Sequence, residues 1–106
     1  MDTFYYKVDF SNVKDAWDIH TILDESLNFA EPYFRNLDSL LDCLTDMLSD
    51  ISVIELHGLE KLKKYDGYDQ RLLSVFRSAK HVWGDEFSRR FLVTIIHEDG
   101  TREKLM

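Results

Sequence analysis

Cysteine is nearly absent from this sequence of 106 residues, in which Cys43 stands alone. An intrachain disulfide is therefore excluded, and this suits a reducing compartment, so we expect a cytoplasmic protein. No apolar run is long enough to cross a bilayer, and the N-terminal residues lack the basic and apolar regions of a secretory signal. Neither membrane insertion nor secretion is indicated.

Glycine and metal-binding patterns are also scarce. None of the four glycines stands in a phosphate-binding pattern such as GxGxxG. The histidines have no metal-binding spacing, and Cys43 has no CxxC partner; these histidines are His20, His57, His81 and His97. We therefore expect no cofactor, no metal and no catalytic residue, because a small enzyme using His20, His57 or clustered carboxylates has little support. His20 is expected to be a hydrogen-bonded core or boundary residue, and Cys43 a buried structural thiol.

Basic residues are few in the N-terminal half. Residues 1–56 hold 12 acidic residues against three basic ones, a net charge of −9, whereas residues 57–106 hold 8 acidic and 10 basic residues, a net charge of +2. A total of −7 disfavours direct nucleic-acid binding, which depends on Lys and Arg along the phosphates. The distribution favours a basic protein partner at the N-terminal half.

The remaining composition is that of a folded domain. Hydrophobic residues make up 44% and charged residues 31%, so we expect a single domain over residues 1–106. Strand-type segments cover residues 4–10, 51–56 and 91–96, and the second is an almost continuous apolar run, as expected for a central parallel strand covered by helices. A turn at residues 98–101 could lead into a short antiparallel edge strand over residues 102–105.

Helical periodicity fills the segments between these strands. A first helix should begin at residue 13, capped by Ser11 or Asn12, and end before Pro32; its apolar face is predicted to be Val13, Ala16, Trp17, His20, Leu23 and Leu27. A second helix should start at Asn36 as N-cap, with an apolar stripe at Leu37, Leu40, Leu41, Leu44, Met47 and Leu48. A short helix is expected over residues 59–65, and a longer one over residues 68–83 with Gly84 as its C-terminal cap.

This order of elements predicts an α/β fold. Three strands separated by helix pairs imply right-handed crossovers, and hence a small three-stranded parallel sheet packed with about four helices.

The second predicted helix carries an acidic ridge, which we define as Asp38, Asp42, Asp46 and Asp50 at i, i+4 spacing opposite the leucines. Each like-charge pair costs an isolated helix about 0.2–0.5 kcal/mol. The ridge has two interpretations: the solvated face of an acidic protein, or a docking surface for the Arg and Lys residues of a protein that binds polyanions, such as a nuclease. Tyr33 and Phe34, just before the helix, could supply an aromatic anchor; core packing is as plausible for Phe34 and less plausible for Tyr33.

The segment Pro32-Tyr33-Phe34-Arg35-Asn36-Leu37-Asp38-Ser39-Leu40-Leu41-Asp42-Cys43-Leu44 resembles the signature of the barstar family of intracellular ribonuclease inhibitors. The resemblance extends through residues 13–15, 53–55 and 72–80, and so covers nearly the whole chain. It implies a barstar-like fold in which a loop and the following helix plug the active site of a barnase-type ribonuclease.

The resemblance also implies a set of partner-binding residues. By position, Asp38 and Asp42 match acids that contact the partner, and Tyr33 and Asn36 flank them. With the neighbouring aromatic, apolar and acidic positions, the predicted set is Tyr33, Phe34, Asn36, Asp38, Leu41, Asp42 and Asp46.

Several positions depart from the family pattern. The usual glycine before Arg35 and Asn36 is absent, Leu41 stands where barstar has tryptophan, and Ser78 and Val82 replace two glutamates. The partner is therefore expected to be a basic ribonuclease or a related nuclease or toxin, with an adaptor or immunity-type module that binds another basic protein as the alternative. We expect a monomer when free; the sequence assigns no role to residues 97–106.

Overall fold

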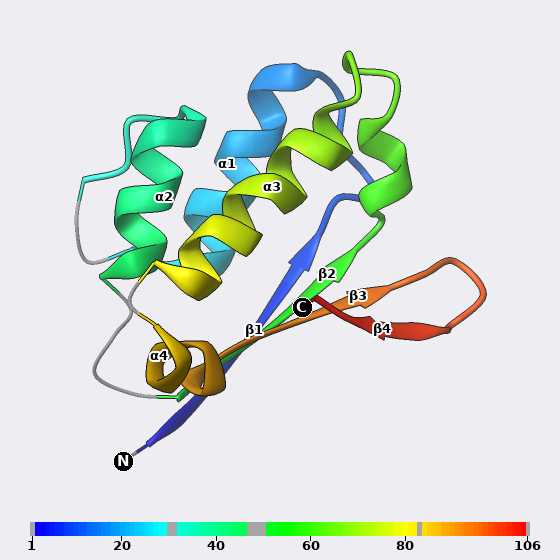
Figure 1. Cartoon of the computed structure of the whole chain (residues 1–106). Helices are drawn as coiled ribbons and strands as arrows, with labels where there is room; N and C mark the ends of the chain where they lie inside the picture. The colour runs from blue at the N-terminus through cyan, green and yellow to red at the C-terminus, as the bar shows by residue number, and fades with distance from the viewer. Residues whose placement is uncertain (1, 30–31, 47–50, 83, 106) are drawn as a thin grey trace.

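The computed structural model describes residues 2–29, 32–46, 51–82 and 84–105, which form a sheet covered by a layer of helices (Figure 1). In chain order the elements are β1 (Thr3–Asp9), α1 (Ala16–Leu27), α2 (Leu37–Thr45), β2 (Ile51–His57), the 3-10 helix η1 (Leu59–Leu62), α3 (Tyr68–His81), α4 (Asp85–Arg90), β3 (Phe91–Ile96) and β4 (Arg102–Lys104). The predicted α/β class and the three predicted strands are confirmed.

The sheet has the order β1-β2-β3-β4, with β2 as the central parallel strand. Tyr6 pairs with Ile54, and Ile54 pairs with Val93, so one row of side chains crosses all three parallel strands. Parallel neighbours need long crossovers, and the helices supply them. β4 pairs with β3 in the antiparallel sense, which confirms the predicted C-terminal edge strand.

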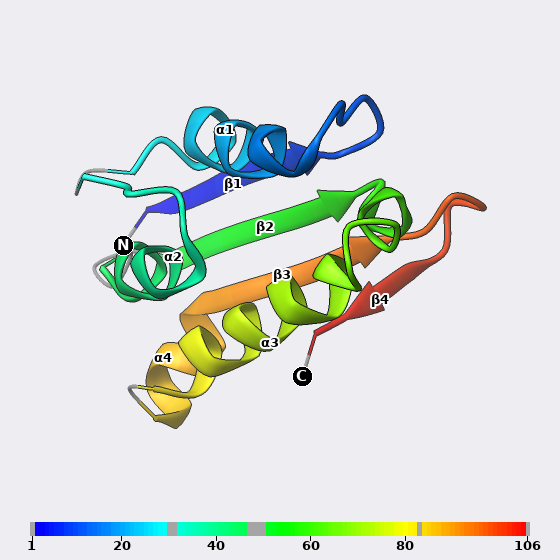
Figure 2. The same cartoon turned by 90° about the horizontal axis from the view of Figure 1, so that it is seen from above.

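Helices cover one face of this sheet. Buried residues alternate along the inner strands, at Ser52, Ile54 and Leu56 in β2 and at Phe91, Val93 and Ile95 in β3. α1, α2 and α3 all lie on that side (Figures 1 and 2). On the other side Tyr5 is 78% exposed and Leu92 is 41% exposed. The apolar run in β2 therefore has one well-buried face and one half-buried face.

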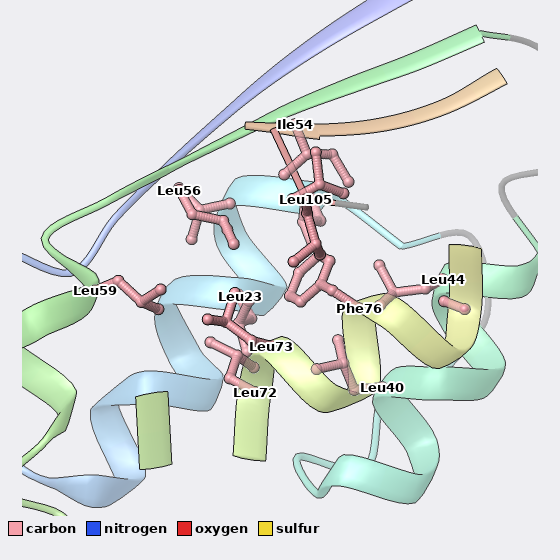
Figure 3. Packing of buried hydrophobic residues seen from close by; sticks show 14 of the residues in the cluster. Leu23, Leu40, Leu44, Ile54, Leu56, Leu59, Leu72, Leu73, Phe76 and Leu105 are labelled. Atoms are coloured by element: carbon pink, nitrogen blue, oxygen red, sulfur yellow. The ribbon is translucent and has the colours of Figure 1, made fainter. Parts of the chain in front are cut away.

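The core lies between this sheet face and the helices. Leu40 and Leu44 of α2 and Phe76 of α3 are completely buried and point toward one another (Figure 3). Phe76 also stacks on Phe91 of β3, with 6.4 Å between the ring centroids. Burying a side chain of this size contributes about 1.5–3 kcal/mol. These contacts hold α2 and α3 to the sheet and to each other.

α1 differs from the prediction at its start. Its N-cap is Asp15, whose carboxylate accepts from the backbone N–H of Asp18 at 2.8 Å, so the predicted caps Ser11 and Asn12 are wrong. Trp17 is 63% exposed, and Ile19 is buried instead. At about 100° per residue Trp17 lies roughly 120° away from Leu23, outside the buried stripe. The predicted C-terminal end is confirmed, since the helix stops at Leu27.

The end of α3 also differs. Gly84 begins α4 as its N-cap, and does not end α3, whose C-cap is Val82. α4 was not predicted, because six residues are too few to show helical periodicity. Lys80 stabilises this corner: its Nζ donates to the carbonyl oxygens of Ser88 at 2.7 Å and Phe91 at 2.9 Å. Trp83, predicted as the last residue of the helix, lies outside the described residues.

Two further predicted boundaries change. The short helix expected over residues 59–65 is a single 3-10 turn, η1. α2 begins after Asn36, as predicted, and is described as far as Thr45. Met47 and Leu48, placed on its apolar stripe by the sequence, lie outside the described residues.

Gly58 is required where β2 passes into η1. Its φ is +70°, and a Cβ there would lie 2.6 Å from the backbone nitrogen of Ser11. Gly67 is a matched control, with φ of +67° and nothing within 4 Å of such a Cβ.

We expect Gly67→Ala to lower the free energy of unfolding by about 1–2 kcal/mol for the left-handed backbone alone. Gly58→Ala should cost about 1–3 kcal/mol more for the clash. Equal losses in urea denaturation would contradict this account.

Candidate partner-binding site

Burial of one side of α2 determines which of its residues meet solvent. Leu40 and Leu44 are fully buried, so the opposite side of the helix faces outward. Asp38, Asp42 and Asp46 lie on that side and are exposed. The structure thus brings together the predicted ridge, apart from Asp50, which lies outside the described residues.

The ridge is not explained by helix stability. Asp38 lies in the first turn, where the helix dipole favours a carboxylate, but Asp46 is the C-cap residue, where the dipole opposes it. The last turn of α2 has no basic residue to compensate. Helix stability alone would select a different residue at Asp46.

The loop before α2 is held by hydrogen bonds to the first turn. Asn36 caps the helix as predicted: its Oδ1 accepts from the backbone N–H of Ser39 at 2.7 Å. The Ser39 hydroxyl oxygen in turn accepts from the backbone N–H of Phe34 at 2.9 Å. The first bond satisfies a free N–H group of the first helical turn, and the second fixes the backbone at Phe34.

The two aromatic residues of the loop point in opposite senses. Phe34 is 73% exposed, whereas Tyr33 is partly buried and packs against the hydrophobic core. The ring of Tyr33 also contacts Phe29, with 5.1 Å between the centroids. The sequence had made core packing more plausible for Phe34 than for Tyr33, and the structure reverses that order.

Tyr33 packs inward because a buried histidine receives its hydroxyl group. His20 Nδ1 is hydrogen-bonded to the Tyr33 hydroxyl, and His20 Nε2 to the Tyr68 hydroxyl at 2.6 Å. A neutral imidazole has one donor and one acceptor nitrogen, which two hydroxyl groups can satisfy. His20 is therefore the hydrogen-bonded buried residue that the sequence predicted, and it links the loop to α1 and α3.

Burial perturbs this cluster. Desolvation, together with the positive charge of Arg35, lowers the pKa of His20 below its usual value. Desolvation also raises the pKa of the Tyr33 and Tyr68 hydroxyls. Each shift favours the neutral form, so the three groups act as hydrogen-bonding partners and not as charges.

Arg35 is a site residue that sequence reasoning missed. Its φ is +58°, and its side chain turns back onto α1, where NH1 donates to the Thr21 hydroxyl at 3.2 Å and NH2 lies 3.5 Å from an Asp24 carboxylate oxygen. The guanidinium also lies 5.5 Å from the ring centroid of Trp17. The signal in the sequence is the i, i+4, i+7 spacing of these three α1 residues, which places them on one side of the helix.

A shallow groove joins the loop to the ridge. Its lining residues are Pro32, Phe34, Asn36, Ser39, Asp42, Cys43 and Asp46. Four predicted site residues therefore share one depression. Asp38 and Leu41 do not line it: Asp38 is exposed on the same ridge, and Leu41 is half-buried against the core.

Cys43 closes the floor of this groove. Its thiol is buried and donates to the carbonyl oxygen of Pro32 at 3.8 Å. This confirms the predicted buried position of Cys43.

Among the described residues, including those of the groove, no group of three His, Cys, Asp or Glu side chains could hold a metal ion. Among those same residues, no helix has the length and apolar character needed to cross a membrane.

The chain is similar to a known protein family and to a named protein. The family model described as "Barstar (barnase inhibitor)" matches residues 3–95. A protein of Bacillus subtilis (strain 168) named "Putative ribonuclease inhibitor YrdF" is 34% identical to the chain over 80 residues, which cover 74% of this chain and 85% of that protein. The family is described by inhibition and not by a reaction, in agreement with the expectation that the chain is not an enzyme.

The lowered pKa of His20 predicts a pH-dependent stability. An unfolded histidine titrates near 6.5 and the folded one below it, so the unfolded state takes up the proton first as pH falls. The stability that neutral His20 contributes is complete above pH 6.5 and is lost as pH drops through the folded-state pKa. We expect His20→Gln to flatten the fall in unfolding free energy between about pH 7.5 and 5.5. His81→Gln, at an exposed position, should retain the wild-type slope in urea denaturation; a wild-type slope in His20→Gln would refute the assignment.

Proposed function

The chain belongs to the barstar family, and on that premise we propose that it inhibits a basic ribonuclease by covering the enzyme's active site with α2 and the loop before it. The proposed partner-binding residues are Tyr33, Phe34, Asn36, Asp38, Leu41, Asp42 and Asp46. The observation that carries the proposal is the groove in which an exposed aromatic ring lies beside two carboxylates.

The chemistry of this surface suits a ribonuclease. An enzyme that cleaves RNA must present Arg, Lys or His to phosphate groups, and carboxylate oxygens can accept the same hydrogen bonds. Asp38, Asp42 and Asp46 offer such oxygens along one side of a helix. The inhibitor would thus occupy the phosphate-binding residues without offering a bond to cleave.

Arg35, the one basic residue among the described residues 32–36, is turned away from this surface. Arg35 lies against Asp24 and Trp17 of α1, so its charge is partly neutralised there. A guanidinium projecting beside the ridge would repel a basic partner. The contacts of Arg35 therefore support binding as well as loop geometry.

The loop is also held in one conformation before binding. The backbone N–H of Phe34 donates to the Ser39 hydroxyl oxygen, and the Tyr33 hydroxyl is hydrogen-bonded to His20. A preorganised loop loses less conformational entropy on association than a mobile one. We assign Tyr33 a positioning role and Phe34 the direct aromatic contact, with half-buried Leu41 as the apolar margin of the ridge.

The same proposal places the protein in the cytoplasm, a reducing compartment that suits its free, buried Cys43. It also has the chain act as a single domain that is monomeric when free.

An adaptor that binds another basic protein remains the second candidate. Ser78 and exposed Val82 favour it, because they provide no carboxylates on α3 to add to those of α2. Binding without loss of RNA cleavage would distinguish the adaptor from the inhibitor.

Removing the central charge of the ridge should weaken the complex most. We expect Asp42→Asn to cost about 2–5 kcal/mol of binding free energy, because basic groups of the enzyme would be left buried and unpaired. The measurement is calorimetric titration against barnase and other small basic ribonucleases, with RNA cleavage assayed in parallel. Glu103→Gln on β4 is the charge-matched control and should leave affinity unchanged. Equal affinities for the two variants would exclude the ridge as the binding site.

Phe34 should act as an anchor and not as a core residue. Because its side chain is 73% exposed, Phe34→Ala should leave the unfolding temperature within about 2 °C of wild type and weaken ribonuclease binding by about 1–3 kcal/mol. Tyr5→Ala, on the uncovered sheet face, is the matched control and should not affect binding. A large loss of stability in Phe34→Ala would show that the ring packs in the core.

A further inference from the structure

Two exposed aromatic side chains flank Arg35. Of the exposed phenylalanine, tyrosine and tryptophan residues that the structure describes, Phe4 and Tyr5 lie on β1, whereas Trp17 lies on α1 and Phe34 on the loop before α2. Phe34 directly precedes Arg35 in the chain. Trp17 is 63% exposed, and its ring centroid lies 5.5 Å from the Arg35 guanidinium. The proposed function uses Phe34 but leaves Trp17 without a role.

Trp17 lies on the side of α1 that faces the loop. Arg35 reaches that helix through the Thr21 hydroxyl at 3.2 Å and an Asp24 carboxylate oxygen at 3.5 Å. Thr21 and Asp24 follow Trp17 by four and seven positions, so at about 100° per residue all three lie within about 60° of one another. Seen from above, the loop passes between α1 and α2 (Figure 2). Trp17 therefore borders the loop on one side, and α2 borders it on the other.

An interface of ordinary size reaches from the acidic ridge to Trp17. Such an interface buries about 800 Å² on each partner, which equals a circular patch about 16 Å in radius. Arg35 and Asp38 are three residues apart, so their Cα atoms lie within about 11 Å of each other. The guanidinium of Arg35 spans the remaining gap to the indole. A partner centred on the loop and the first turn of α2 would therefore extend to Trp17.

The charge around Trp17 suits the same partner. Residues 14–27 hold four acidic residues and one basic residue, a net charge of −3, so α1 attracts a basic enzyme as α2 does. Arg35 is the positive charge beside the indole, and Asp24 lies close enough to pair with it. A covered charge is costly when it is unpaired. An enzyme that excluded water from this part of the surface would therefore leave Arg35 with a partner.

The indole of Trp17 is suited to an apolar group of the enzyme. The Arg35 guanidinium already lies beside the ring, and it would repel a second cation brought to the same place. Most of an indole is hydrocarbon, and tryptophan is enriched among the residues that anchor protein interfaces. The contact with Arg35 also restricts the ring before association, which reduces the side-chain entropy lost on binding.

We infer that the binding surface continues across Arg35 onto α1, where Trp17 is a second aromatic anchor that packs against an apolar patch beside the basic cleft of the ribonuclease. This inference rests on the proposed function and adds to it a contact on a second helix. It also makes Trp17 a determinant of specificity. A ribonuclease with a charged group at that patch would bury the charge against the indole without a partner and bind more weakly.

Removal of the indole tests the inference. Against any ribonuclease of the panel that the intact chain inhibits, we expect Trp17→Ala to weaken binding about five- to thirtyfold, mainly through faster dissociation. Trp17→Phe should retain part of the affinity, because an apolar ring remains. Tyr5→Ala removes an exposed ring from the uncovered sheet face and should leave affinity unchanged. Unfolding curves of each variant ensure that folded protein is compared.

A double-mutant cycle separates direct contact from support of the loop. If Trp17 touches the enzyme, Trp17→Ala should still weaken binding at least about threefold in an Arg35→Ala background. A loss that vanishes in that background would show that Trp17 only holds Arg35, and the inference would be wrong.

The remaining outcomes separate this inference from the proposed function. If Asp42→Asn weakens binding while Trp17→Ala stays within about twofold of the intact chain, no anchor lies on α1 and the inference is wrong, although inhibition through α2 stands. If no ribonuclease binds, or Asp42→Asn has no effect on the complex, the proposed function fails and the inference fails with it.

Discussion

Burial of Leu40 and Leu44 against Phe76 and the sheet fixes the rotation of α2 about its axis, and the geometry of the site follows from that rotation. A helix that turned by a quarter would expose leucine and bury aspartate. Burying an unpaired carboxylate costs several kcal/mol, so the core and the ridge enforce the same orientation. The apolar side of α2 therefore determines where its carboxylates can meet a partner.

The loop before α2 depends on a second set of contacts, made by side chains from three helices. Ser39 of α2 holds the backbone of Phe34, Thr21 and Asp24 of α1 hold Arg35, and His20 with Tyr68 of α3 receives Tyr33. None of these contacts is strong alone, and an exposed ion pair such as Arg35 with Asp24 contributes about 0–1 kcal/mol. Together they specify one loop conformation, in which Phe34 faces solvent.

The exposed charged residues differ between α2 and α3. α2 bears carboxylates despite their mutual repulsion and the unfavourable dipole at Asp46, while the exposed surface of α3 bears arginine and histidine. Such a pattern contributes little to the stability of the fold, which rests on the apolar core. It does decide which surfaces can approach, because charges at an interface affect the rate and selectivity of association more than its strength.

Much of this architecture could be predicted from local patterns. The strand at residues 91–96, the Asn36 cap and the outward position of the ridge each depend on residues close in sequence, through strand propensity, an N-cap hydrogen bond or helical periodicity. The resemblance of residues 32–44 to barstar pointed to the same helix and to the family. Where periodicity was weak, prediction failed: α4 has six residues, and Trp17 lies outside the buried stripe of α1.

Tertiary structure alone decided the rest, because it brings together side chains that are distant along the chain. The sequence could not show that His20 meets Tyr68, 48 residues away, and so draws Tyr33 inward and leaves Phe34 outward. Nor could it show that Arg35 folds back onto Trp17, or that α3 lies beside α2. The helix and the outward position of its carboxylates were determined by residues close in sequence. The conformation of the loop and the elements that surround the acidic ridge were determined by tertiary packing.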